Sequence, residues 1–135
     1  MTSSSRLHEG VSVEDHLVVL NLLGRYAHLL DDRDMDACAA LFHPDCVVTF
    51  DGTPYAGAAE IRRWQQGLAA QPPGRHMVAG PVVWREDGTL HALSDFTYTK
   101  KIDGTWTTLA CGRWNDTFAE GADGLTFASR DIVLA

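Results

Sequence analysis

Two side chains in this sequence have the types and positions needed for acid–base chemistry, Asp31 and His76. Asp31 opens an acidic corner at residues 31–34, directly after a predicted helix, and His76 opens a predicted strand. A carboxylate bound to one nitrogen of an imidazole orients the ring, so the other nitrogen can take up a proton near neutral pH and return it. Such a pair suits proton removal beside a carbonyl, loss of water, or an aldol-type ring closure. The residues alone also allow a structural interpretation, in which Asp31 caps the following helix and His76 is a satisfied core histidine.

Three further polar residues are candidates for contact with a substrate: Tyr26, Asn115 and Arg113. Tyr26 lies just over one turn before the acidic corner. Its hydroxyl either donates to a substrate oxygen or packs against the backbone. Asn115 and Arg113 flank Trp114 in a predicted strand, so they share the face opposite Trp114. If Asn115 faces a pocket, Arg113 faces it too or sits at its rim, paired with an acid.

The elements that must position these residues begin with three helices. Ser12 is predicted to cap the first, because two acidic residues follow it and suit the helix dipole. Asp34 is predicted to cap a second, short helix, and residues 57–68 form a third. β-Branched and aromatic residues at 46–50 predict a strand between the second and third helices. Apolar residues at spacings of three and four predict one buried stripe on the first helix, formed by Leu17, Leu20, Leu23, Ala27 and Leu30.

The second half of the chain is a series of predicted strands, at residues 75–84, 90–101, 105–119 and 125–134. The Asp-Gly pairs between them, at residues 87, 103 and 123, are strong hairpin signals. Helices first and strands last predict an α+β fold, in which helices cover one face of an antiparallel sheet. The other face needs cover, and a second copy of the chain provides it. We therefore expect a homodimer whose interface is the outer face of residues 90–119.

Composition limits the class of protein and its partners. A composition of 45% apolar and 21% charged residues is typical of a globular protein. We expect a disordered tail at residues 1–11 and a single domain at residues 12–135. A net charge of −7 argues against a nucleic-acid or anionic-membrane partner. No apolar run approaches the ~20 residues that span a bilayer, and the N-terminus lacks the apolar centre of a secretory signal. The expected partner is a small molecule, and the expected location is the cytoplasm.

The three cysteines, Cys38, Cys46 and Cys111, lack any metal-binding or redox spacing, and buried free thiols are expected. The run of acids from residue 32 to residue 36 resembles the start of a calcium loop. However, Ala37 stands where the loop needs glycine, and His43 where it needs glutamate. The chain also has no phosphate-binding glycine loop and no dinucleotide fingerprint. We therefore expect neither a metal nor a cofactor.

Four stretches of this chain, taken together, resemble a known family. They are R-Y-A-x-x-L-D-D-R-D-M-D at residues 25–36, F-x-P-D-C-V-V at residues 42–48, G-R-H-M-V at residues 74–78, and C-G-R-W-N-D-T-F followed by F-A-S-R-D-I at residues 111–132. Their order and spacing are similar to the SnoaL-like branch of the nuclear transport factor 2-like superfamily, which includes scytalone dehydratase. The resemblance covers residues 12–132. It implies a cone-shaped barrel, in which a curved sheet wraps around N-terminal helices and a pocket lies at the wide end.

The resemblance also implies roles for individual residues. An aspartate from the first corner and a histidine from the central strands carry over to Asp31 and His76. An asparagine on a late strand carries over to Asn115. Such enzymes also hold water with two tyrosines, for which Tyr55 and Tyr98 are available here in addition to Tyr26, although Leu30 occupies one of the tyrosine positions.

The implied function is a cofactor-independent enzyme that uses the Asp31 and His76 side chains. It would dehydrate, isomerise or cyclise an apolar, oxygenated ring or polyketide-type molecule. The alternative is a non-catalytic ligand-binding or accessory subunit, similar to the small subunit of ring-hydroxylating dioxygenases. A pocket lined by both side chains would favour the enzyme, whereas a cone filled by apolar side chains would favour the accessory role.

Overall fold

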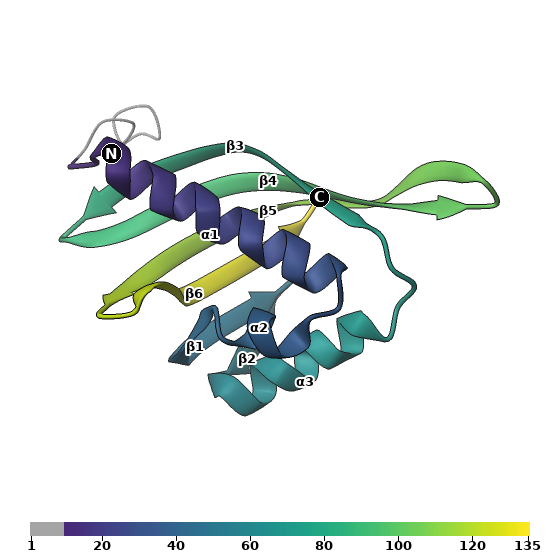
Figure 1. The fold of residues 1–135 in the computed structure, drawn as a ribbon, viewed down its shortest axis with the longest axis horizontal. Coiled ribbons are helices and arrows are strands. Elements are labelled where there is room, and N and C mark those ends of the chain that lie inside the picture. The colour runs from purple at the N-terminus through teal and green to yellow at the C-terminus, as the bar shows by residue number, and fades with distance from the viewer. Residues whose placement is uncertain (1–9) are drawn as a thin grey trace.

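The computed structural model describes residues 10–135 and confirms the α+β class, with helices in the first half and antiparallel strands in the second (Figure 1). Of the predicted tail, residues 1–9 lie outside the described residues, and Val11 packs against the core. The elements are α1 (Val13–Asp31), α2 (Met35–Ala39), β1 (Phe42–Phe50), β2 (Thr53–Ala56), α3 (Gly57–Ala69), β3 (Arg75–Glu86), β4 (Thr89–Ile102), β5 (Thr105–Gly121) and β6 (Gly124–Leu134).

Helix α1 begins as its sequence predicts, because Ser12 and Asp15 form a capping box. The Ser12 hydroxyl accepts the Asp15 backbone N–H at 3.0 Å, and the Asp15 carboxylate accepts the Ser12 N–H at 3.3 Å. The predicted stripe is wrong near the start of the helix, where Leu17 is 59% exposed. The buried face instead consists of Val19, Leu22, Leu23, Tyr26, Ala27, Leu30 and Asp31. This face carries Tyr26 and Asp31 towards the sheet.

The six strands form one sheet in the order β2-β1-β6-β5-β4-β3. Among the strand pairs of residues 10–135, only β1 and β6 run in parallel, and the predicted antiparallel meander is confirmed for β3 to β6. All three predicted Asp-Gly pairs mark a hairpin, but at the third Gly121 pairs with Gly124, so the turn residues are 122 and 123. At the other two, Asp87 and Gly88 have φ of 50° and 81°, and Asp103 and Gly104 have φ of 48° and 81°. Two successive positive φ angles are the type I′ geometry that matches strand twist. The sheet curves around α1 without closing, since β2 and β3 remain its edges (Figure 1).

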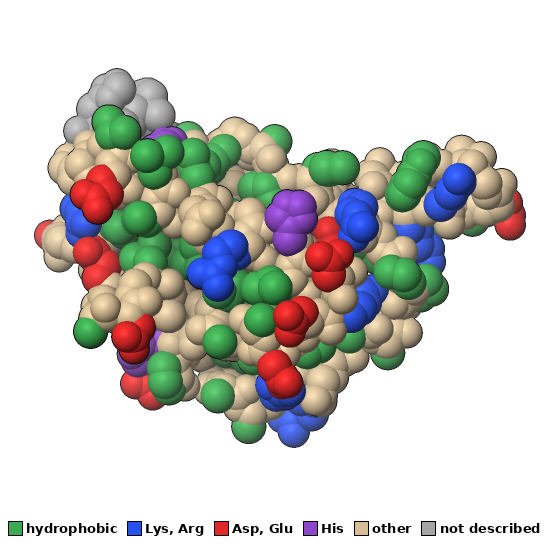
Figure 2. All heavy atoms as spheres, in the orientation of Figure 1, with side chains coloured by type: hydrophobic (Ala, Val, Ile, Leu, Met, Phe, Trp, Pro, Cys, Tyr) green, Lys and Arg blue, Asp and Glu red, His purple; other side chains and the backbone are tan. Residues whose placement is uncertain are grey.

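The β4–β5 hairpin extends beyond the rest of the sheet (Figure 1). Figure 2 shows apolar and basic side chains on this projection. Its apolar members are unusually accessible: Trp106 is 64% exposed and Leu109 48% exposed. Among the described residues, no helix has the length and apolar character needed to cross a membrane.

Candidate active site

Asp31 and His76 are in direct contact, as the sequence predicts. Asp31 is the last residue of α1 and is 4% exposed. One carboxylate oxygen lies 2.6 Å from His76 Nδ1, and the other accepts the His76 backbone N–H at 2.7 Å. Because a carboxylate only accepts, Nδ1 carries the proton in this contact and Nε2 is left as the free nitrogen of the ring.

Local sequence explains why this contact forms. The α1 helix stops where Arg33 takes a left-handed φ of 62°, which turns the chain at the acidic corner. The Arg33 guanidinium holds that corner by donating to the carbonyls of Leu30 and Gln71, each at 2.9 Å. His76 is the second residue of β3, an edge strand. An edge strand has backbone N–H groups without a strand partner, and Asp31 accepts the one at His76.

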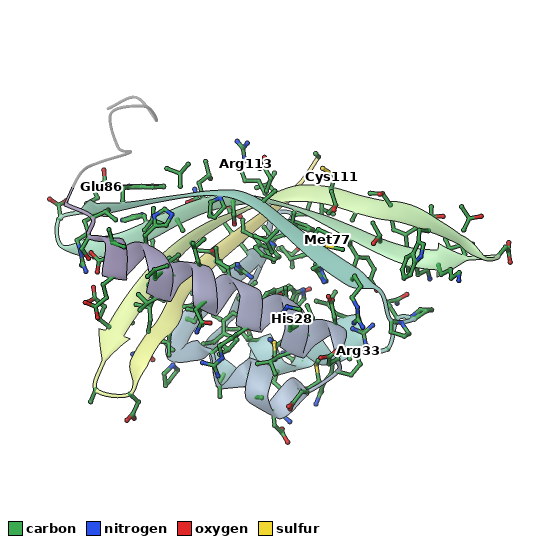
Figure 3. The ribbon with its side chains drawn as sticks, turned by 45° about the horizontal axis from the view of Figure 1, so that its top comes forward. His28, Arg33, Met77, Glu86, Cys111 and Arg113 are labelled. Atoms are coloured by element: carbon green, nitrogen blue, oxygen red, sulfur yellow. The ribbon has the colours of Figure 1, made fainter. Side chains whose placement is uncertain are left out.

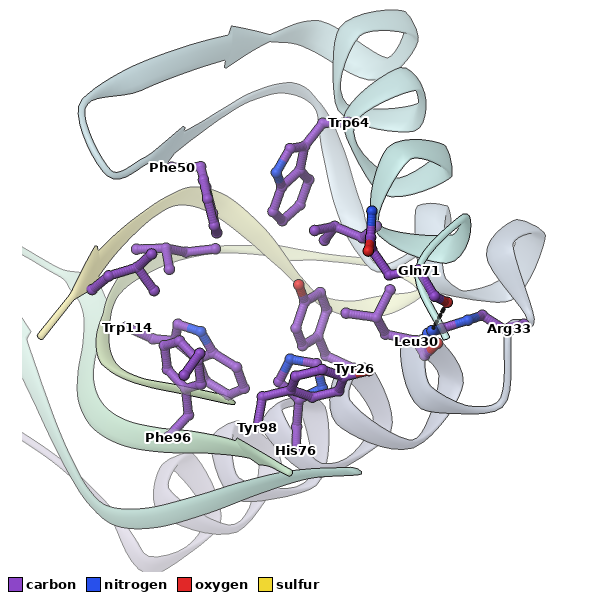
Figure 4. Close-up of a pocket in the computed structure, with 14 residues that line it drawn as sticks. Tyr26, Leu30, Arg33, Phe50, Trp64, Gln71, His76, Phe96, Tyr98 and Trp114 are labelled. Atoms are coloured by element: carbon purple, nitrogen blue, oxygen red, sulfur yellow. Dashed lines mark hydrogen bonds between the residues drawn. The ribbon is translucent and has the colours of Figure 1, made fainter. Parts of the chain in front are cut away.

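His76 reaches a cavity of about 150 Å³ enclosed by α1, α3 and the concave face of the sheet (Figure 4). Asp31 does not line the cavity but lies behind His76. The lining is mostly aromatic and aliphatic: Tyr26, Leu30, Arg33, Phe50, Trp64, Leu68, Gln71, His76, Phe96, Tyr98, Ala110, Trp114, Ile132 and Leu134. Apolar walls with a few polar groups are typical of small-molecule sites.

The His76 ring is held among aromatic rings. Its centroid lies 4.7 Å from that of Tyr98, 6.0 Å from Phe96 and 6.3 Å from Trp114. The Phe96 ring has room at this position because its neighbour Gly112 has no side chain. A Cβ on Gly112 would be 2.8 Å from the Phe96 ring. The ring contacts and the bond to Asp31 together fix the orientation of the His76 ring in the cavity wall.

Tyr26 supplies a second polar group to the cavity. Its side chain comes from α1, is 1% exposed and points its hydroxyl into the enclosed space (Figure 4). Burial raises the pKa of the Tyr26 hydroxyl above its usual value, although the nearby Arg130 charge opposes the shift. At neutral pH the hydroxyl therefore keeps its proton and can donate it in a hydrogen bond.

The other two tyrosines differ in their relation to the cavity. Tyr98 lines it, but its hydroxyl donates to the Pro72 carbonyl at 2.9 Å and so ties down the chain between α3 and β3. Tyr55 does not line the cavity. Its ring packs behind Trp64, with the centroids 6.0 Å apart. Of the three predicted tyrosines, Tyr26 therefore combines a cavity position with a hydroxyl that points into the space.

Asn115 and Arg113 do not reach this cavity, contrary to expectation. Both are exposed, and Arg113 lies on the convex face of the sheet (Figure 3), where it pairs with Asp95 at 2.8 Å. The two residues do share a face opposite Trp114, but Trp114 is the one that turns inward and lines the cavity. Successive residues of a strand point to opposite faces, so a buried Trp114 forces both neighbours outward.

Sequence reasoning missed most of the cavity wall, including Trp64, Phe96 and Trp114. A signal was present in β5, where Trp114 and Phe118 mark one face of the strand as the buried one.

The cysteines also differ in part from expectation: Cys38 and Cys46 are buried, whereas Cys111 is exposed. Within residues 10–135, no three His, Cys, Asp or Glu side chains are arranged to hold a metal ion.

A family model for the SnoaL-like domain matches residues 11–131, which is most of the chain. The chain belongs to the SnoaL-like domain family. No curated protein matches the sequence. The family assignment agrees with the resemblance found in the sequence, and the fold described above is the cystatin-like fold of nuclear transport factor 2-like proteins.

Several solved structures share this SnoaL-like fold at low sequence identity. Aln2 from a Streptomyces species is 23% identical with a TM-score of 0.84, and the match covers 92% of this chain and 93% of that chain. A Catenulispora acidiphila protein in complex with S-DNPA is 24% identical with a TM-score of 0.81, covering 91% and 95%. A provisionally named scytalone dehydratase from Novosphingobium aromaticivorans is 15% identical with a TM-score of 0.81, covering 91% and 85%. At these identities the likeness shows the fold alone.

Proposed function

We propose that this SnoaL-like protein is a cofactor-independent enzyme that moves protons on an oxygenated ring, with Asp31 and His76 as its acid–base pair. One observation carries the proposal. The His76 imidazole lines an apolar cavity. One of its nitrogens is bound to the buried Asp31 carboxylate, which leaves the other nitrogen free. A carboxylate that holds a histidine in one tautomer and orientation is the usual support for a histidine general base.

The chemistry assigns different tasks to the two polar groups of the cavity. His76 Nε2 removes a proton from the carbon beside a substrate carbonyl, and the electron pair moves to the carbonyl oxygen. The Tyr26 hydroxyl donates a hydrogen bond to that oxygen as negative charge develops. The proton on Nε2 is then returned to a leaving hydroxyl, to another carbon, or to the oxygen formed by ring closure. These three outcomes are dehydration, isomerisation and cyclisation.

The cavity limits the size of the reacting part. A closed apolar cavity of ~150 Å³ in another protein binds benzene, so the volume here suits one six-membered ring. Seven of the lining side chains carry an aromatic ring or an imidazole: Tyr26, Phe50, Trp64, His76, Phe96, Tyr98 and Trp114. A planar ring bearing a carbonyl or hydroxyl group fits this wall, and a larger substrate would extend towards Arg33 and Gln71 at the end of the cavity (Figure 4).

Two simple ketones in D₂O test the proposal. Cyclohexanone reports proton exchange beside the carbonyl, and 3-hydroxycyclohexanone also reports loss of water. We expect the protein to accelerate deuterium uptake, followed by NMR, and His76→Gln to abolish the acceleration. Binding of these ketones without any accelerated exchange would contradict the proposal and favour a non-catalytic ligand-binding role.

A further inference from the structure

A fully buried ion pair lies directly behind the cavity wall. Asp116 on β5 and Arg130 on β6 are partners in the sheet register, and both side chains have 0% exposure. The contact is bidentate, with Arg130 Nε 2.7 Å and Nη2 3.0 Å from the two carboxylate oxygens. Neither residue lines the cavity, so neither is in a position to touch a molecule bound there.

The Arg130 cation is surrounded by aromatic rings, two of which belong to the cavity wall. Its guanidinium carbon lies 4.3 Å from the ring centroid of Tyr26, 4.0 Å from that of Trp114 and 4.3 Å from that of Phe127. Tyr26 and Trp114 also meet edge to face, with centroids 5.4 Å apart. Both rings line the cavity and both contact the cation, and Trp114 also stacks on Phe96, with centroids 5.0 Å apart.

Stability alone is a poor reason for this arrangement. Burying two charges is costly, and well-packed apolar residues at such positions are often as stable or more stable. The third nitrogen of the Arg130 guanidinium, Nη1, is buried without a hydrogen-bond partner among residues 10–135. Buried donors without partners are rare in folded proteins and call for an explanation. The aromatic contacts offer one, because the cation acts on the two rings that form the cavity wall.

Building on the proposed function, we infer that Arg130 is a positioning residue that acts through Tyr26. Held by Asp116, its cation fixes the Tyr26 and Trp114 rings from behind and strengthens the Tyr26 hydroxyl as a donor to negative charge on a substrate oxygen. A fixed positive charge near a phenol polarises its O–H bond and favours the state in which a bound oxygen is an anion.

Binding of two probes of nearly equal size separates this role from simple packing. The anion of 4-nitrophenol carries a negative oxygen that Tyr26 can bind, whereas 4-nitrotoluene offers only a neutral ring of the same shape. Affinities are measured above the pKa of 4-nitrophenol for the wild type and for the double variant Arg130→Met/Asp116→Leu. We expect the double variant to lose roughly tenfold to a hundredfold in affinity for the anion, the usual value of a charge-assisted hydrogen bond, and little for nitrotoluene.

The route through Tyr26 is tested by adding Tyr26→Phe. In the Tyr26→Phe background, removing Arg130 and Asp116 should cause no further loss of anion affinity, because residues that act as a unit are non-additive. The ion pair of Arg85 with Asp15 is the matched control. It is also bidentate, at 2.9 and 3.1 Å, and lies at the opposite end of α1 from the cavity. Arg85→Met/Asp15→Leu should leave the affinities for both probes unchanged.

Three results would overturn the inference: equal losses for both probes, additive losses in the Tyr26→Phe background, or no preference of the wild type for the anion. If the double variant does not fold, Arg130→Lys keeps the charge but loses the planar fork. It should lower anion affinity and spare nitrotoluene affinity, and the reverse pattern contradicts the inference. Probe binding needs no proton transfer. A protein without exchange activity that still shows the Tyr26-dependent preference would contradict the proposed reaction alone.

Discussion

Both oxygens of the Asp31 carboxylate bind the same residue, His76, one through its ring and the other through its backbone. The ring nitrogen lies at 2.6 Å and the backbone nitrogen at 2.7 Å. A carboxylate held at two points cannot rotate away from the imidazole, so the direction of the free Nε2 is set by the end of α1 and the start of β3 together. Asp31 therefore lies behind the cavity wall, whereas His76 lies in it.

The first prediction concerns this pair. Asp31→Asn and His76→Gln should each lower the exchange rate with cyclohexanone by roughly 10²–10⁴-fold, the usual contribution of a positioned proton carrier. The double variant should lose little more than the worse single variant, since the two groups form one unit. NMR of deuterium uptake measures the rates, and circular dichroism checks folding.

His28 is the matched control for the acid–base pair, because it is an exposed histidine on the same helix, pointing away from the cavity (Figure 3). His28→Gln should leave exchange unchanged. Full exchange activity in both Asp31→Asn and His76→Gln would assign the chemistry to other groups. A large loss of stability with normal exchange would instead mean that the pair is structural, since breaking a buried pair is expensive.

A second prediction is the homodimer through the convex face of the sheet. On the β4–β5 hairpin that extends from this sheet, Trp106 and Leu109 expose 64% and 48% of their surface. Burying such side chains against a second copy would remove apolar area from water. Sedimentation equilibrium should give a dimer at micromolar concentration, and Trp106→Asp with Leu109→Lys should give a monomer. Leu17→Lys, at a 59% exposed site on α1, should leave the dimer intact. A monomeric wild type contradicts this prediction.

The third prediction concerns Gly112, which leaves room for the Phe96 ring. A Cβ at this position would lie 2.8 Å from that ring and 2.5 Å from the Val133 carbonyl. Gly112→Ala should therefore lower the free energy of unfolding by about 1–3 kcal/mol, the usual cost of overpacking. Gly24→Ala in the middle of α1, where a Cβ meets nothing within 4 Å, should raise it by about 0.5–1 kcal/mol. Urea unfolding measures both, and equal effects would contradict the packing argument.

The fourth prediction concerns the thiols. Burial raises the pKa of Cys38 and of Cys46 to about 12, so at pH 7 both remain protonated. The thiolate is the reactive form, and both groups are also shielded from reagents. Iodoacetamide should therefore label the exposed Cys111 first, with Cys38 and Cys46 labelled only on unfolding. Peptide mass spectrometry gives the order, and early labelling of either buried thiol would show that α2 and β1 open readily.

The contact between Asp31 and His76 could be predicted because each lies at the end of an element with clear signals. The interruption of apolar spacing after Leu30 marks the end of α1, and the Pro-Pro-Gly run at residues 72–74 marks the approach to β3. Helix ends and strand starts depend mainly on local sequence, through caps, turn residues and proline. The Asp-Gly turns predicted the order of the later strands for the same reason.

What the sequence alone determined was therefore local: where elements begin and end, and which residues share a face. Tertiary structure decided which face is inside. In β5 the alternation already separated Trp114 from Asn115 and Arg113, but only packing against α1 turned Trp114 into the cavity. Likewise, only the register of β5 with β6 sets Asp116 opposite Arg130. The physical reason is the two-residue period of a strand, since a shift by one residue exchanges every inward side chain for an outward one.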